Sequence, residues 1–68
     1  MMKNKLHTAL MSKYQAERDE GLATLEVYCN NAAGIGEHPQ IVEEMAKMVE
    51  KVANAQDCIE VLTINRPD

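Results

Sequence analysis

The sequence predicts an all-α fold, an antiparallel two-helix hairpin with helices at about residues 4–30 and 39–63, which we expect to dimerise into a four-helix bundle. In the second half of the chain, apolar residues recur at alternating steps of four and three. Three glycines and two prolines leave too few turns for a β-fold of 68 residues. A short Asn- and Gly-rich stretch separates the two helices, and a short loop joins antiparallel neighbours.

The first predicted helix carries a broad apolar stripe that is interrupted in the middle. The stripe comprises Leu10, Tyr14, Leu22, Leu25 and Tyr28 or Cys29. Either heptad register places Arg18 on this face. Gly21 also lies in mid-helix, where it costs about 1 kcal/mol relative to alanine. A close approach of the other helix or simple tolerance would each account for this glycine.

Two patterns compete for the start of the first helix. Ser12 and Gln15 match a capping box, which would start the helix near Ser12. Leu6, Leu10 and Tyr14 keep a spacing of four, which would instead extend it to about residue 4. Residues 1–11 are therefore either helix or a flexible extension.

The segment 30–38 is predicted to be the loop, because its Asn and Gly residues tolerate the positive φ of turns and helix ends. Ile35 between two glycines is expected to plug the end of the hairpin. Pro39 suits the first position of the second helix, with His38 as its cap. Pro67 ends that helix, so residues 65–68 are expected to form a frayed tail.

The second predicted helix has an unbroken heptad seam, which no strand could produce. The seam comprises Ile41, Met45, Met48, Val52, Ala55, Ile59 and Leu62. Val42 and Val49 lie beside it and widen the stripe. Glu43, Glu50 and Asp57 occupy the opposite, outward face, so this helix is strongly amphipathic.

Self-association is predicted because one neighbouring helix is too narrow to cover this stripe. In a chain of this size, conformational entropy nearly cancels apolar burial, so a further stabilising device is needed. We expect the core and oligomer seam to comprise Leu22, Leu25, Ile41, Met45, Met48, Val49, Val52, Ile59 and Leu62. Arg18 would fix the register by pairing with Glu50. The orientation of the two hairpins and the number of copies stay open.

The sequence offers no catalytic, metal or cofactor site. In a hairpin Cys29 and Cys58 would lie roughly 27 Å apart, too far for a disulfide, so both are expected to be reduced thiols. His7 and His38 lack ligand spacing, and the two glycines of the loop lack the strand and third glycine of a dinucleotide site. We therefore expect no enzyme.

Charge is unevenly distributed around a net value of −4. Residues 1–16 carry three lysines and no acid, whereas residues 17–68 carry eleven acids and four bases, a balance of −7. The acidic body argues against nucleic acid as a partner. No apolar run is long enough for a membrane span or a secretory signal, so a cytoplasmic location is expected.

Three runs resemble short uncharacterised proteins of tailed phages from marine and cyanobacterial settings. They are Tyr14-Gln15-Ala16-Glu17-Arg18-Asp19, Leu25-Glu26-Val27-Tyr28 and Gly34-Ile35-Gly36-Glu37-His38-Pro39. The resemblance spans about residues 12–64. It implies a small accessory protein made in an infected bacterial cytoplasm, with Met11 as a natural start, and carries over no functional residue.

The expected function is a small acidic oligomeric protein-interaction module, an accessory or regulatory factor that docks onto a host or phage protein. One alternative is a minor virion or assembly component. Another is an inhibitor that mimics nucleic acid through Glu43, Glu50 and Asp57. These acids would lie about 10.5 Å apart along a helix, wider than the ~7 Å phosphate spacing of DNA.

Overall fold

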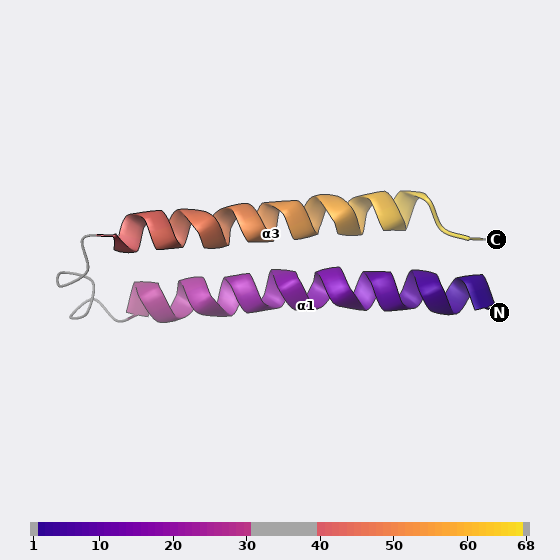
Figure 1. The fold of residues 1–68 in the computed structure, drawn as a ribbon, viewed down its shortest axis with the longest axis horizontal. Coiled ribbons are helices and arrows are strands. Elements are labelled where there is room, and N and C mark those ends of the chain that lie inside the picture. The colour runs from indigo at the N-terminus through magenta and orange to yellow at the C-terminus, as the bar shows by residue number, and fades with distance from the viewer. Residues whose placement is uncertain (1, 31–39, 68) are drawn as a thin grey trace.

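The computed structural model describes residues 2–30 and 40–67, and within those ranges the chain forms two helices and no strand. Helix α1 spans Met2–Asn30 and helix α3 spans Ile41–Ile64. The helices lie side by side and antiparallel, with the start of α1 beside the end of α3 (Figure 1). The molecule is a rod of 51 × 14 × 13 Å. The predicted helical hairpin is confirmed.

The helix ends differ from the predicted ones by two residues or fewer, except for the alternative start near Ser12. Helix α1 begins at Met2, so Ser12 lies inside the helix and forms no cap. Helix α3 begins at Ile41, and the Gln40 carbonyl accepts a hydrogen bond of 3.0 Å from the N–H of Glu44. The predictions for the loop, including Ile35 and His38, and the placement of Pro39 fall outside the described residues.

Helix α3 ends in a compact cap. The backbone N–H of Asn65 donates to the Val61 carbonyl at 3.0 Å, and the side-chain Nδ2 of Asn65 donates to the same oxygen at 2.9 Å. Terminal carbonyls of a helix lack intrahelical donors, so this double contact stabilises the end of α3.

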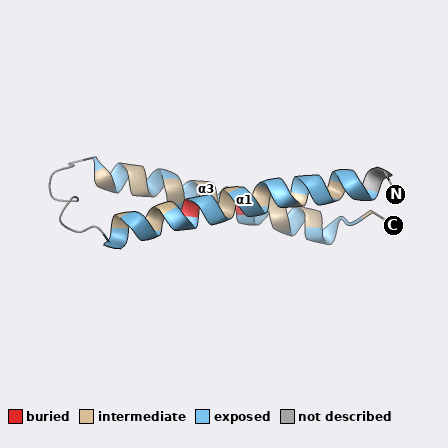
Figure 2. Ribbon diagram, turned by 90° about the horizontal axis from the view of Figure 1, so that it is seen from below, coloured by how far each residue is buried: buried red, intermediate tan, exposed pale blue. Residues whose placement is uncertain are grey.

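The two helices meet along matching heptad seams. On α1 the seam comprises His7, Met11, Tyr14, Arg18, Gly21, Leu25 and Tyr28, and on α3 it comprises Ile41, Met45, Met48, Val52, Ala55, Ile59 and Leu62. Among the described residues only Gly21 and Ala55 are fully buried, and every other seam residue is half-buried (Figure 2). The core of a single hairpin is therefore thin.

The predicted apolar stripe of α1 is partly wrong. Tyr14, Leu25 and Tyr28 lie on the seam, but Leu10, Leu22 and Cys29 are exposed beside it. The reason is geometric: the seam keeps its four–three spacing and passes through polar or small residues. Choosing apolar residues alone therefore added residues that lie on both sides of the seam, Leu10 on one side and Leu22 and Cys29 on the other.

Gly21 allows the close approach of the two helices. A methyl group at this position would lie 2.6 Å from Cγ2 of Val52 and 3.4 Å from the backbone oxygen of Met48. The first distance is shorter than a van der Waals contact, and the β-branched Val52 side chain is stiff on a helix. Close approach, rather than simple tolerance, explains the glycine.

We expect Gly21→Ala to lower the free energy of unfolding by about 1 kcal/mol. Overpacking of about 2 kcal/mol outweighs a gain of about 1 kcal/mol in helix propensity. Adding Val52→Ala makes room for the new methyl group, so the pair should cost about 1 kcal/mol less than the two single changes together. Urea unfolding followed by circular dichroism measures both effects. The exposed control Ala23→Gly should cost about 1 kcal/mol through propensity alone, and additive single effects would contradict the close-packing explanation.

Candidate functional site

The two sides of the hairpin differ in chemistry. We call one side the uncharged flank, which comprises Thr8, Gln15, Leu22, Cys29, Val42, Val49, Gln56 and Thr63. The other is the charged flank, which comprises Leu10, Glu17, Thr24, Glu44, Lys51 and Cys58. In each helix the two sets lie on opposite sides of the seam. Leu10 and Cys58 line one groove, which places these two sets of α1 and α3 on the same side.

The uncharged flank is also the more open one. All eight of its residues are exposed, whereas every residue of the charged flank except Leu10 is half-buried. The apolar residues of the uncharged flank expose large fractions of their surface: 47% for Leu22, 54% for Val49 and 72% for Val42. A continuous, charge-free and uncovered surface on an acidic protein is a candidate binding site.

Ion pairs gather around the charged flank. Lys51 Nζ lies 2.5 Å from Glu20 Oε1 and links the two helices, and Lys13 pairs with Glu17 at 3.1 Å within α1. The hydrogen bond and charge of Lys51 lower the pKa of Glu20 below its ordinary value. A lowered carboxyl pKa contributes stability above the ordinary pKa, and this contribution is lost as the pH falls through the lowered value. Solvent exposure keeps it small.

An apolar groove of about 300 Å³ opens on the charged side near the chain ends. We call it the terminal groove. Its lining comprises Leu10, Tyr14, Asp57, Cys58, Val61 and Leu62. Leu6 and Ile64, in the same end region of the helices, are 69% and 72% exposed. The groove is therefore a second exposed apolar surface, separate from the uncharged flank.

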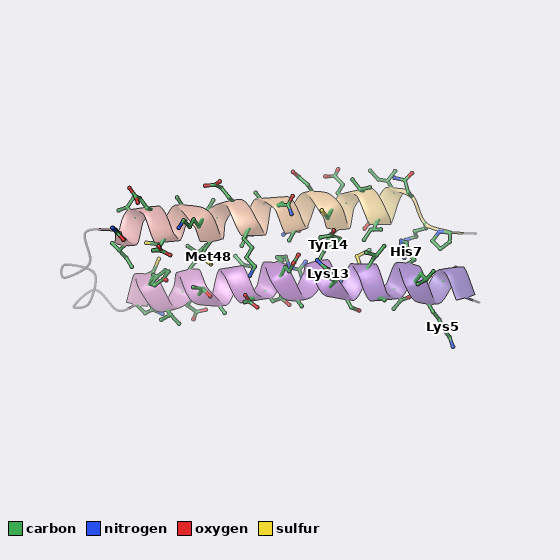
Figure 3. All side chains as sticks on the ribbon, viewed as in Figure 1. Lys5, His7, Lys13, Tyr14 and Met48 are labelled. Carbon is green, nitrogen blue, oxygen red and sulfur yellow. The ribbon has the colours of Figure 1, made fainter. Side chains whose placement is uncertain are left out.

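His7 holds the end of α3 against α1, a role that sequence reasoning missed. Its Nε2–H donates to the Leu62 carbonyl at 2.7 Å, and that carbonyl is one of the last four of α3. Figure 3 shows His7 directed towards α3, whereas Lys5, two residues earlier, points away from it. The sequence signal for this role is the presence of a histidine at a seam position of the heptad repeat.

We expect His7→Ala to lower the free energy of unfolding by about 1 kcal/mol, because the Leu62 carbonyl loses its donor. His7→Gln keeps an N–H donor and should recover part of this loss. Thermal unfolding followed by circular dichroism measures both. The exposed control Lys5→Ala should change stability by less than about 0.5 kcal/mol, and an equal loss in the control would refute the capping role.

Arg18 lies on the seam as predicted, but its ion pair differs from the predicted one. Arg18 Nε lies 3.0 Å from Asp19 Oδ1, and the Arg18 side chain is 27% exposed. Glu50 is exposed and lies on the outward face of α3. The predicted Arg18–Glu50 pair is therefore wrong for the single hairpin. Glu50 lies on the outward face of α3, and the guanidinium of Arg18 pairs with the adjacent Asp19 instead.

The predicted association residues fall into two groups. The seam holds Leu25, Ile41, Met45, Met48, Val52, Ile59 and Leu62. Leu22 and Val49 lie on the uncharged flank instead. Cys29 and Cys58 are both free thiols. The surface on which self-association would act is thus distinct from the contact between α1 and α3.

Residues 2–30 and 40–67 hold no group of three His, Cys, Asp or Glu side chains arranged to bind a metal ion. Neither described helix is both long and apolar enough to cross a membrane.

No family model, curated protein or solved structure matches this chain.

Proposed function

We propose that this chain is a small acidic protein-interaction module that works as a dimer of hairpins. The observation that carries the proposal is the imbalance between buried and exposed apolar side chains. Ala55 is the one fully buried hydrophobic residue in the described chain. The large hydrophobic residues that expose 44–72% of their surface are Leu6, Leu10, Leu22, Val27, Val42, Val49, Val61 and Ile64.

Two separate apolar surfaces favour two kinds of partner. The uncharged flank carries no charged side chain, which suits burial against a second copy that presents the same surface. The terminal groove is bordered by Asp57 and by the ion pairs of the charged flank, an arrangement typical of the polar rim of a transient interface. Dimerisation through the flank leaves both grooves free for another protein.

The groove would accept an apolar side chain of that protein, because Leu10, Val61 and Leu62 line it. Its volume fits one or two such side chains rather than a whole helix. We therefore propose an accessory or regulatory role in the cytoplasm, exerted by docking and without catalysis.

The acidic stripe of α3 does not favour the nucleic-acid mimic. Glu43, Glu50 and Asp57 are exposed on the outward face. Their seven-residue spacing gives about 10.5 Å along the helix, which does not match the phosphates of a DNA strand.

Affinity capture with the wild-type chain and two variants tests the docking role. Immobilised wild-type chain should retain one cytoplasmic protein from a lysate of the cells that make it. Val61→Lys places a charge on the groove and should lose that protein while remaining dimeric. Glu50→Lys places the same side chain on the outward face of α3, away from both the groove and the uncharged flank, and should keep it. Recovery only with assembled particles would favour the structural alternative, and equal capture by all three chains would refute the groove as the docking site.

A further inference from the structure

We infer that the second copy covers the uncharged flank with both hairpins pointing in the same direction, so that α1 of each chain lies beside α3 of the other. The inference rests on the proposed self-association and specifies its surface and its orientation. All eight residues of the uncharged flank are exposed, so this surface is open to a second copy.

The flank is large enough for a stable dimer. The flank runs about 32 Å along each helix, and two helices side by side, each about 10 Å wide with side chains, make it about 20 Å wide. It therefore offers about 640 Å² per chain, or about 1,280 Å² for a pair. Stable interfaces bury ~1,200–2,000 Å² in total. A second copy can therefore cover the whole flank, whereas one short peptide would leave most of it exposed.

Composition changes along the flank in the same way on both helices. The half near the end of α1 and the start of α3 is apolar and comprises Leu22, Cys29, Val42 and Val49. The half near the start of α1 and the end of α3 is polar but uncharged and comprises Thr8, Gln15, Gln56 and Thr63. Because the helices are antiparallel, the apolar residues of both helices share one end of the rod, and the polar residues share the other.

Among the arrangements that cover the whole flank, only the same-direction one places like against like. A two-fold axis along the rod puts Leu22 and Val49 against the same residues of the second copy. Gln15 and Gln56 then lie against the glutamine side chains of the second copy, whose amides both donate and accept hydrogen bonds. A two-fold axis across the rod would instead press Leu22 and Val49 against glutamines, and each polar group buried without a partner costs about 1–3 kcal/mol.

Charges at the edge of the flank add little to this preference. In the same-direction dimer, Asp19 and Glu26 of α1 lie level with Ala53 and Ala46 of the second copy, whereas the opposite arrangement brings Asp19 close to Asp19 of the second copy. Asp19 pairs with Arg18 at 3.0 Å, and Asp19, Glu26 and Arg66 are all exposed, so solvent and salt screen these charges in either case. The orientation therefore rests on the apolar and polar halves of the flank.

Chemical cross-linking of single-cysteine variants tests the orientation. Cys58→Ser leaves the thiol of Cys29 at one end of the flank. The triple variant Thr8→Cys, Cys29→Ser, Cys58→Ser places the one thiol at the other end, about 30 Å away along the helix. Each variant is treated alone with a short bifunctional maleimide, and then a re-equilibrated mixture of the two is treated. The same samples carrying Val49→Lys measure cross-linking by random collision.

Same-direction dimers should give cross-linked pairs within each variant alone and none between the two variants. Opposite-direction dimers should give the reverse, with cross-links only between the two variants. That second result overturns this inference but leaves the proposed dimer standing. Light scattering on the untreated samples separates the remaining case: monomers with collision-level cross-linking would overturn both the orientation and the proposed self-association.

Discussion

Val49→Lys should convert the dimer into separate chains, whereas Val61→Lys should leave it intact. The two valines lie on the same helix and are 54% and 57% exposed, so the substitutions match in chemistry and in surface. Val49 belongs to the uncharged flank, and Val61 belongs to the terminal groove. A lysine at position 49 would bury two unpaired ammonium groups per dimer, and an unpaired buried charge costs several kcal/mol.

The expected rise in the dissociation constant for Val49→Lys is at least about 1,000-fold, which corresponds to about 4 kcal/mol. Sedimentation equilibrium over a range of concentrations measures it for both variants. A change of less than threefold is expected for Val61→Lys. Equal weakening by both substitutions would show that the second copy covers more than the uncharged flank, and no weakening by Val49→Lys would exclude that flank.

Ala55→Leu should lower the free energy of unfolding by about 2 kcal/mol. Ala55 is fully buried in the seam, and three added carbons must displace the facing residues of α1. Urea unfolding at fixed chain concentration measures the loss. Ala16→Leu makes the same change on an exposed face of α1 and should stay within about 0.5 kcal/mol of the wild type.

A stabilising effect of Ala55→Leu would contradict the close contact of the helices at this point. It would show that the space between them is wide enough for a larger side chain. The control separates this outcome from the higher helix propensity or hydrophobicity of leucine in general.

The seam of α3 could be predicted from the sequence because its spacing is unbroken. Every residue from Ile41 to Leu62 in the four–three repeat lies towards α1, and the outward positions are acidic. The same repeat placed Arg18 on the seam of α1. Helical periodicity is a local property, so it needs no knowledge of the partner helix.

The face of α1 could not be predicted in full because tertiary contacts decide its polar positions. His7 lies on the seam because its ring reaches the Leu62 carbonyl, and Gly21 lies there because Val52 fills the space. Both contacts depend on how far α3 is displaced along α1. Leu10 and Leu22 looked like core residues but lie to the sides, since apolar character alone does not fix the angle of a helix about its axis.

The uncharged flank can be recognised only from the sequence and the structure together. Its lack of charge can be read from the sequence once the seam of each helix is known. A flank residue comes directly after every second seam residue, as Thr8 comes after His7. Its openness could not be read in advance. The Lys51–Glu20 ion pair bridges the helices on the charged side, where all flank residues except Leu10 are half-buried, whereas all eight residues of the uncharged flank are exposed.

The central claim is that a second copy completes the core, and helix content measured together with mass over a dilution series tests it most directly. Light scattering at micromolar concentration should give twice the 7.6 kDa chain mass, and circular dichroism should show helix content falling as dilution splits the pair. A particle of 7.6 kDa that keeps its full helix content at every concentration would contradict the claim.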